Sequence, residues 1–499
     1  MSRTELSSVP FALGSLLLVA SCAQQDGVER SGGPATPTVS ANVSSGPGPD
    51  FYVSPTGSPS GDGSFTNPWD LVTALNGPTT VTPGSTIWLR GGMYTNGTYH
   101  GGYWSNLTGT AAAPIVVRQY PGERAIVQNN LGIWGSDTWY WGFEVVNPDP
   151  TGSHILGINT RGPRTKLINL VVHDASASGI FVGLEATDAE VYGSISYNNG
   201  SVNNQDHGIY CQSQTSNLLQ DNIVFDNWAY GLHCYAEAGE YLQNIHLQGN
   251  VAFNNNAISG VPWGGDVLVG GAVPALGIIV DQNYTYRTLP SDYALDLGYS
   301  TASQDLVATN NYLVGGSWHV APWVTATVTG NTLYNFTSGG MVSNTGDLRG
   351  HSWSGNTFFG DSTASAWLYN TVTTFSGWRT LTGFSNPGTY AGSTPTGVKI
   401  VLRPNHYEPS RANIIVYDWA QQSTVSVDVS GILNVGDHYV VQNAQDFYGI
   451  PATSGTYDGS PLQLPIAGIM PPTPLGNRAV QAAPVTGPTF NVFVLMRTP

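Results

Sequence analysis

One phrase recurs along the middle of the chain at a nearly constant spacing: a short apolar strand, an Asn or small residue, alternating apolar positions and a turn. Clear copies occupy residues 167–174, 219–226 and 247–254. The Asn, or the residue in its place, stands at Gly142, Asn169, Ser194, Asn222, Asn250, Asn283, Asn311, Asn331 and Asn356, at successive spacings of 27, 25, 28, 28, 33, 28, 20 and 25 residues. Strand repeats of this length predict a solenoid, because each coil closes its core only by stacking on its neighbours.

The composition restricts the fold to β structure. Charged residues make up only 10% of the 499 residues, and the only two lysines are Lys166 and Lys399. Long helices need Ala, Leu, Glu, Lys and Arg on their exposed faces, so helical bundles and coiled coils are excluded. A hydrophobic fraction of 40%, with 14 Trp and 25 Tyr, is enough for a large core and excludes disorder over most of the length. The sequence therefore predicts an all-β protein.

The charge balance bears on partners. The chain has 16 Lys and Arg against 32 Asp and Glu, a formal net charge of −16, and no basic run. Binding to nucleic acid needs clustered Lys and Arg, so a nucleic-acid partner is excluded.

The N-terminus has the features of an export signal. Arg3 precedes an apolar run over residues 11–20, and residues 19–22 read Val-Ala-Ser-Cys. This tetrapeptide resembles the bacterial lipobox, which implies acylation of Cys22 and a membrane partner held through that lipid anchor. Residues 23–50 are rich in Gly, Pro, Ser and Thr and predict a flexible linker. We expect a periplasmic or cell-surface lipoprotein; the alternative is an ordinary secretory signal and a secreted protein.

The first strands carry a resemblance to a known fold. Segments 51–57, 83–94 and 114–118 resemble the opening coils of right-handed parallel β-helix proteins of the pectate-lyase-like superfamily. The resemblance implies a right-handed parallel β-helix over residues 51–376. It does not specify a reaction, because the superfamily includes polysaccharide lyases, glycoside hydrolases, epimerases and phage tailspikes. It also implies that the recurring Asn residues stack in an internal ladder, at Asn169, Asn222, Asn250, Asn283, Asn311, Asn331 and Asn356.

The C-terminal part differs in pattern. Residues 377–396 predict a linker, and residues 397–499 contain short alternating strands separated by Gly, Pro and Asn turns. These strands predict a C-terminal β-sandwich domain.

Strand alternation predicts which side chains of the solenoid point outward. In the strands around residues 180, 210 and 233 the aliphatic and Cys residues share one face, so their neighbours face solvent. We expect the outward-facing side chains of successive strands to form one row, and the residues two positions later in each strand to form a second row. His207 should lie beside these rows. The candidate catalytic residues are His207, Tyr210, His233, Glu237 and Asp296, and the candidate substrate-binding residues are Gln212, Tyr235 and His319. Cys211 and Cys234 should stack inward as reduced neighbours, with a disulfide or a zinc site shared with His233 as alternatives.

These residue types are suited to two ways of cleaving a polysaccharide. Elimination at a uronate needs a base and an acid, for which Tyr210 and a histidine are candidates. Hydrolysis needs two carboxylates about 5 to 9.5 Å apart, for which Glu237 and Asp296 are the best pair and Asp206 the third candidate.

The superfamily resemblance implies calcium, but the sequence shows no clear Ca²⁺ site and predicts no metal ligands. The basic group Arg161, Arg164 and Lys166 is typical of a solvated turn. We therefore expect a polysaccharide lyase or glycoside hydrolase acting on a polysaccharide; the alternative is a non-catalytic glycan-binding or adhesive surface lipoprotein.

Overall fold

The computed structural model describes residues 47–148, 154–202, 204–259, 263–288, 293–336, 340–360, 366–476, 478 and 480–498. The expected signal peptide, Cys22 and nearly all of the expected linker over residues 23–50 lie outside the described residues. Among the helices of the described segments, none is long and apolar enough to cross a membrane.

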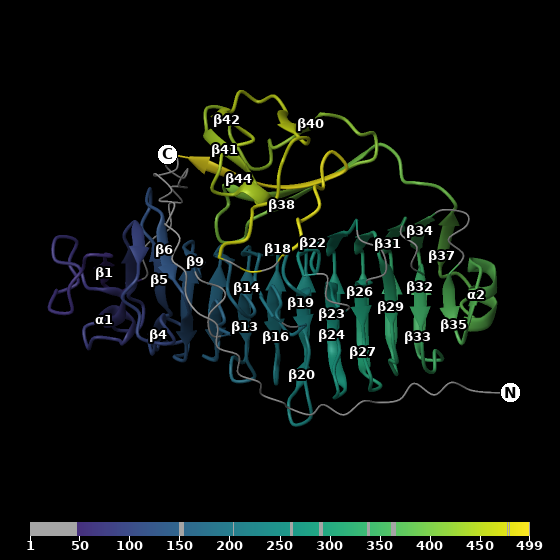
Figure 1. Ribbon diagram of the computed structural model, residues 1–499, viewed down its shortest axis with the longest axis horizontal. Helices are drawn as coiled ribbons and strands as arrows, with labels where there is room; N and C mark the ends of the chain where they lie inside the picture. Colours follow the sequence, from purple (N-terminus) through teal and green to yellow (C-terminus); the bar gives the residue numbers. More distant parts are fainter. Residues whose placement is uncertain are drawn as a thin grey trace, which may run out of the picture. The chain divides into compact units, whose positions relative to one another are not determined.

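Three stacked sheets form the solenoid, and Figure 1 shows its coils following one another from β1 to β37. Sheet 1 contains β1 (Asp50–Val53), β2 (Thr86–Leu89), β5 (Ile115–Gln119), β8 (Thr138–Trp141), β11 (Lys166–Ile168), β14 (Ala189–Tyr192), β17 (Asn217–Gln220), β21 (Ile245–Gln248), β24 (Ala275–Asp281), β27 (Gln304–Thr309), β30 (Ala326–Thr329) and β33 (His351–Ser354), with β20 (Leu242–Gln243) paired to β24. Sheet 2 contains β4 (Tyr103–Ser105), β7 (Leu131–Ile133), β10 (Ile158–Thr160), β13 (Ile180–Val182), β16 (Ile209–Cys211), β19 (Tyr230–Cys234), β23 (Gly265–Val269), β26 (Tyr293–Leu297), β29 (Ser317–Val320), β32 (Val342–Asn344), β35 (Trp367–Tyr369) and β36 (Thr371–Thr373). Sheet 3 contains β3 (Gly92–Tyr94), β6 (Ala125–Gln128), β9 (Glu144–Val146), β12 (Val171–His173), β15 (Ile195–Tyr197), β18 (Ile223–Phe225), β22 (Val251–Phe253), β25 (Tyr284–Tyr286), β28 (Tyr312–Val314), β31 (Thr332–Asn335), β34 (Asn356–Gly360) and β37 (Gly388–Ala391).

Neighbouring strands of these sheets pair in parallel, except β35 with β36. Each coil contributes one strand to each sheet, which confirms the predicted right-handed parallel β-helix. Inward positions such as Ile209, Cys211, Leu232 and Cys234 are fully buried. The alternation of the sequence therefore does separate core from surface, as predicted.

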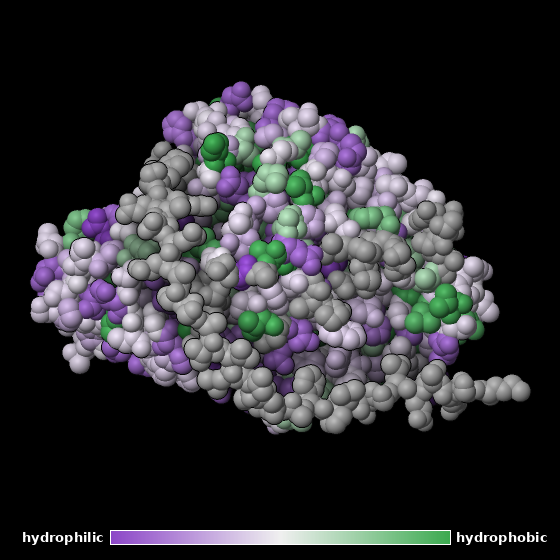
Figure 2. Space-filling view, in the orientation of Figure 1, coloured by the Kyte–Doolittle hydropathy of each residue, from purple (hydrophilic) through white to green (hydrophobic). Residues whose placement is uncertain are grey.

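Short helices lie near the two ends of the solenoid. The helix α1 (Leu71–Leu75) follows β1, and α2 (Phe375–Thr382) follows β36. The Trp378 side chain of α2 is fully buried and packs against Trp353 and Trp367. Residues 377–396, expected to be a linker, instead contain most of α2 and all of β37, which pairs with β34. Figure 2 shows apolar side chains gathered at this end, where Val372 and Leu381 are exposed.

An asparagine ladder runs through the turn between sheets 1 and 3. The Oδ1 atom of each Asn accepts from the backbone N–H and the side-chain amide of the Asn one coil earlier, at 2.8 to 3.1 Å. Its members are Asn222, Asn250, Asn283, Asn311, Asn331 and Asn356. These six predicted assignments are confirmed.

Asn169 does not belong to this ladder, so its assignment was wrong. It occupies the preceding turn position with φ of +51°, a conformation that Asn tolerates better than most residues, and accepts from Asn405 at 2.8 Å. Leu170 takes the ladder position, and its N–H donates to Ser194. Both turn positions favour Asn for different reasons, so residue type alone does not distinguish them.

The C-terminal domain has two antiparallel sheets and is the predicted sandwich, with a small second layer. The larger sheet runs in the order β38 (Val398–Pro404), β39 (Arg411–Asp418), β44 (Phe490–Thr498), β41 (His438–Asn443) and β42 (Thr453–Thr456); β40 (Thr424–Val427) pairs with β43 (Leu462–Pro465), and a 3₁₀ helix, η1, covers Ala444–Asp446.

Alternation in β39 and β44 gives the larger sheet two apolar faces. Ile414 and Phe493 pack into the sandwich interior, whereas Ile415 and Phe490 pack against sheet 3. Polar contacts accompany this packing: Arg403 pairs with Asp221, Asn405 with Asn169, Asn413 with the Asp221 carbonyl, and the Tyr417 hydroxyl with the Thr285 carbonyl. The C-terminal domain thus packs against the outer face of sheet 3.

Candidate functional site

The register of sheet 2 aligns the expected outward row. Across successive parallel strands, Phe181 pairs with Tyr210, Tyr210 with His233, His233 with Leu268, Leu268 with Asp296, and Asp296 with His319. Leu268 is 2% exposed although it stands at an outward position. It divides the row into two groups, one around His233 and one around Asp296 and His319.

The His233 cluster is a compact stack of rings. The His233 ring lies 4.0 Å from His207, 5.3 Å from Tyr210, 5.0 Å from Tyr230 and 5.2 Å from Tyr235, measured between centroids. His207 is 1% exposed, and its Nδ1 accepts from the backbone N–H of Tyr230 at 3.2 Å. His207 therefore supports the cluster from inside, while His233 is the half-buried imidazole.

Burial sets the protonation state of this cluster. Burial lowers the pKa of His233 to about 3. It also holds the pKa of His207 well below its usual value, with His233 as a second cause. The pKa of Tyr210 is raised by burial and then by Glu240, and the pKa of Tyr235 by burial and then by Glu237. At neutral pH the cluster therefore presents uncharged imidazoles and protonated phenols, and His233 is a weak base.

Asp296 and His319 form a hydrogen-bonded dyad. Nδ1 of His319 lies 2.7 Å from Oδ1 of Asp296, and the ring stacks on Tyr293 at 5.3 Å. The Asp296 side chain is 5% exposed and that of His319 is 18% exposed. Burial raises the pKa of Asp296, although the His319 bond opposes the shift. A carboxylate that accepts from Nδ1 leaves Nε2 as the basic nitrogen, which is the arrangement of an oriented general base.

Glutamates lie in the loop that follows β19. The backbone N–H of Glu237 donates to the Glu240 carboxylate at 2.8 Å, and both side chains raise the pKa of Tyr235. Glu237 lies in this loop and Asp296 in β26, where Asp296 is bonded to His319, and the expected use of the two as a carboxylate pair stays a prediction. Asp206, the third candidate, is fully buried and pairs with His154.

Other predicted side chains have supporting positions. Gln212 is 5% exposed and hydrogen-bonds to Tyr210. Cys211 and Cys234 are register partners, fully buried and reduced, and lie below the row. Arg161 is paired with Glu185 at 2.8 Å.

The donor set does not fit the calcium that the superfamily resemblance implied. Among the described residues no group of three or more His, Cys, Asp and Glu side chains is placed to hold a metal ion. The dyad carboxylate is already bonded to His319, so no step is assigned to a metal.

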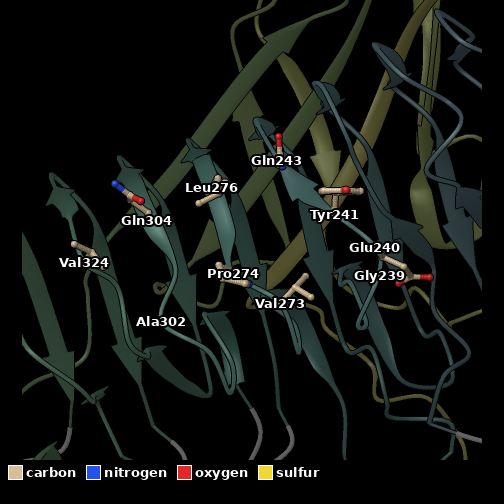
Figure 3. A pocket seen from close by; sticks show the side chains of 10 residues that line it. All are labelled: Gly239, Glu240, Tyr241, Gln243, Val273, Pro274, Leu276, Ala302, Gln304 and Val324. Carbon is tan, nitrogen blue, oxygen red and sulfur yellow. The ribbon is translucent and has the colours of Figure 1, made fainter.

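A groove of about 530 Å³ lies beside β20 (Figure 3). It is lined by Glu240, Tyr241 and Gln243 from one coil and by Leu276, Gln304 and Val324 from the next three. The loop that carries Glu237 and Glu240 leads directly into it. The coil in which the Asn spacing lengthens to 33 residues contributes the seven-residue β24 to the groove, and β20 comes from the preceding coil of 28 residues.

The outward-row analysis missed Tyr230 and Tyr293. Tyr230 lies three residues before His233, and Tyr293 three residues before Asp296. Strict alternation would point a side chain at an odd number of residues from an outward one toward the core. The register of sheet 2 instead aligns both with Gly265, and both rings stack on histidines. The repeated Tyr at equivalent places in two coils is the signal that could have found them.

The comparison with family models supports the fold assignment. No curated protein matches the sequence. Residues 51–267 match the family described as Pel9A-like, right-handed β-helix region. Similar solved structures include pectate lyase Pel9A (17% identity, covering 72% of this chain and 81% of that one, TM-score 0.44), a rhamnogalacturonan lyase (19%, 57% and 82%, 0.42) and the GH136 lacto-N-biosidase from Eubacterium ramulus (12%, 63% and 64%, 0.39). The family match includes the His233 cluster and ends before Asp296. It supports the resemblance to the pectate-lyase-like superfamily that the opening segments indicated.

Proposed function

We propose that this chain is an extracytoplasmic carbohydrate-active β-helix protein that cleaves a polysaccharide, as lyase or glycoside hydrolase, on the outer face of sheet 2. The observation that carries the proposal is the dyad of His319 and Asp296, a partly exposed imidazole oriented by a buried carboxylate. The family match over residues 51–267 supports a glycan as the substrate class.

His319 acts as the general base. Asp296 accepts from Nδ1 and stabilises the imidazolium after Nε2 takes a proton. In a lyase that proton comes from the carbon beside the uronate carboxylate, its electrons form the double bond, and the glycosidic oxygen leaves with a proton from an acid. In a hydrolase the imidazole would take the place of the carboxylate base of the usual carboxylate pair, and Nε2 would deprotonate the attacking water. The Tyr293 phenol, stacked on the imidazole, is the candidate acid in both cases.

The His233 cluster binds another part of the same glycan. His233 lies three strand spacings from His319, or about 14 Å along the solenoid axis. A polysaccharide lying across the strands spans both groups. The neutral imidazole and the phenols of Tyr210 and Tyr235 offer it hydrogen bonds without charge.

The proposed location is the bacterial cell envelope. Acylation of Cys22 would anchor the chain, and residues 23–50 would separate the anchor from the solenoid. Radiolabelled palmitate incorporated by the wild type and lost in Cys22→Ser supports the anchor; label retained in the variant, or none in either, contradicts it.

Activity is tested with a panel of polysaccharides. We expect new reducing ends from at least one member, with ultraviolet absorbance of an unsaturated product if the protein is a lyase and without it if it is a hydrolase. His319→Ala should abolish the product, whereas Gln463→Ala on the C-terminal domain should not. Unchanged activity in His319→Ala would overturn the assignment of the base.

A non-catalytic glycan-binding function is the second candidate. The lowered pKa values of His207 and His233 favour it, because these imidazoles do not exchange protons near neutral pH. If the protein binds a glycan of the panel but forms no product from any of them, the glycan-binding function is supported and the cleavage is not.

A further inference from the structure

We propose that the groove beside β20 is a separate subsite for a neutral sugar residue, such as a side branch of the bound glycan. The inference rests on the proposed function, because it takes the substrate class to be a polysaccharide. Its site lies on sheet 1, away from the outward row of sheet 2.

The register places an apolar side chain between two amides. Gln243 pairs with Leu276 across β20 and β24, and Leu276 pairs with Gln304 across β24 and β27. The two amides are therefore two strand spacings apart, or about 10 Å. Figure 3 shows the three side chains in line across neighbouring strands. A pyranose has apolar C–H faces and a rim of hydroxyls, so this arrangement matches its two kinds of surface.

Tyr241 supplies an open aromatic wall. Its side chain is 48% exposed, and within the described part of the chain it takes part in no ring stacking and no side-chain hydrogen bond. This distinguishes it from Tyr210, Tyr230 and Tyr235, whose rings are stacked on His233. Tyr241 is the tyrosine of this region whose ring is free to pack against a sugar.

The negative charge that lines the groove favours a neutral ligand over an anionic one. Among the described residues that line it, Glu240 is the one charged residue and none is basic. A uronate carboxylate would meet this carboxylate without a cation to pair with, whereas a neutral sugar would find an additional hydrogen-bond acceptor.

The backbone of β24 has a glycine at the point where it lies beside β20. Gly277 has φ of +67°, and a Cβ there would lie 2.5 Å from Oδ1 of Asn244. This glycine lets β24 bend beside β20, which is the pair that brings Gln243 next to Leu276.

The test is affinity electrophoresis in native gels, with the full chain carrying His319→Ala so that no glycan is consumed. The probes are galactan, xyloglucan and mannan as neutral polymers, and polygalacturonate and alginate as anionic ones. We expect retardation by at least one neutral polymer, little changed by added salt. Tyr241→Ala and Gln304→Ala should each weaken it about tenfold, which is the effect of losing one stacking or hydrogen-bonding contact. Gln463→Ala, an exposed Gln on the C-terminal domain, is the matched control and should behave as the parent.

Retardation by anionic polymers alone, by no polymer, or equally in the Tyr241 and Gln304 variants would overturn the subsite. Circular dichroism establishes that the variants are folded, which we expect because both side chains are exposed. The proposed cleavage can be wrong while the subsite is right. That is the result if the chain with intact His319 gives no product but neutral glycan still binds through Tyr241.

Discussion

Replacing Asn250 by Ala should destabilise the solenoid strongly. Asn250 is 1% exposed and takes part in four hydrogen bonds: its Oδ1 accepts twice from Asn222, and its Nδ2 donates to the Leu219 carbonyl and to Asn283. At about 1 kcal/mol net for each bond the loss is about 4 kcal/mol, and the buried Asn222 N–H left without its acceptor adds to it. This is a large share of the stability of a typical domain, which is about 5 to 15 kcal/mol.

The free energy of unfolding is measured by urea titration followed by far-ultraviolet circular dichroism. Asn434→Ala is the matched control, because Asn434 is exposed and should cost less than about 0.5 kcal/mol. Equal midpoints for the two variants would refute the reasoning that the ladder stabilises the fold. Asn250→Asp separates acceptor from donor, since it keeps the acceptor for Asn222 and removes both donated bonds.

The other predictions concern buried charges. Both carboxylate oxygens of Asp226 lack a hydrogen-bond partner in the described structure, and burial, then Asp266, holds its pKa well above the unfolded value. The wild type should therefore lose stability as the pH rises from about 4 through that raised pKa, and Asp226→Asn should lose less, so urea midpoints of the two should diverge with rising pH. Arg403→Ala leaves Asp221 buried without its partner and should cost about 3 to 5 kcal/mol, seen as earlier proteolysis of the C-terminal domain; unchanged digestion would contradict this. Asp296→Asn should lower kcat at least about 100-fold with little change in KM, and an equal rise in KM would point to a binding role.

The fold was predictable because its signals are local and repeated. Asn222 and its five ladder partners recur every 20 to 33 residues with one neighbour pattern and one burial, so nine copies of the phrase were enough to find them. Asn169 was misassigned because adjacent turn positions favour Asn for two different reasons, a ladder bond and a positive φ. The contents of residues 377–396 were missed because α2 and β37 are stabilised by distant residues, among them Trp353 and Asn356.

The candidate site was only partly predictable. Alternation identified Tyr210, His233, Asp296 and His319, because the side-chain period of a strand is fixed. It could not show that His207 is buried, since burial there depends on rings from neighbouring coils. The pairing of His319 with Asp296 likewise depends on the register between coils, which the spacing after residue 260 left undetermined.

The contacts of the C-terminal domain have a consequence for the number of coils. The ladder alone would tolerate the loss or gain of a whole coil, because each Asn bonds only to its neighbours. The contacts of the C-terminal domain would not tolerate such a change. They join Asn405 to Asn169, Arg403 to Asp221 and Tyr417 to Thr285, and the three partners belong to different coils. Within that stretch the domain therefore sets the number of coils. The Trp419 ring of the domain also packs edge-on against Tyr334 of β31, which extends this constraint two coils beyond Thr285.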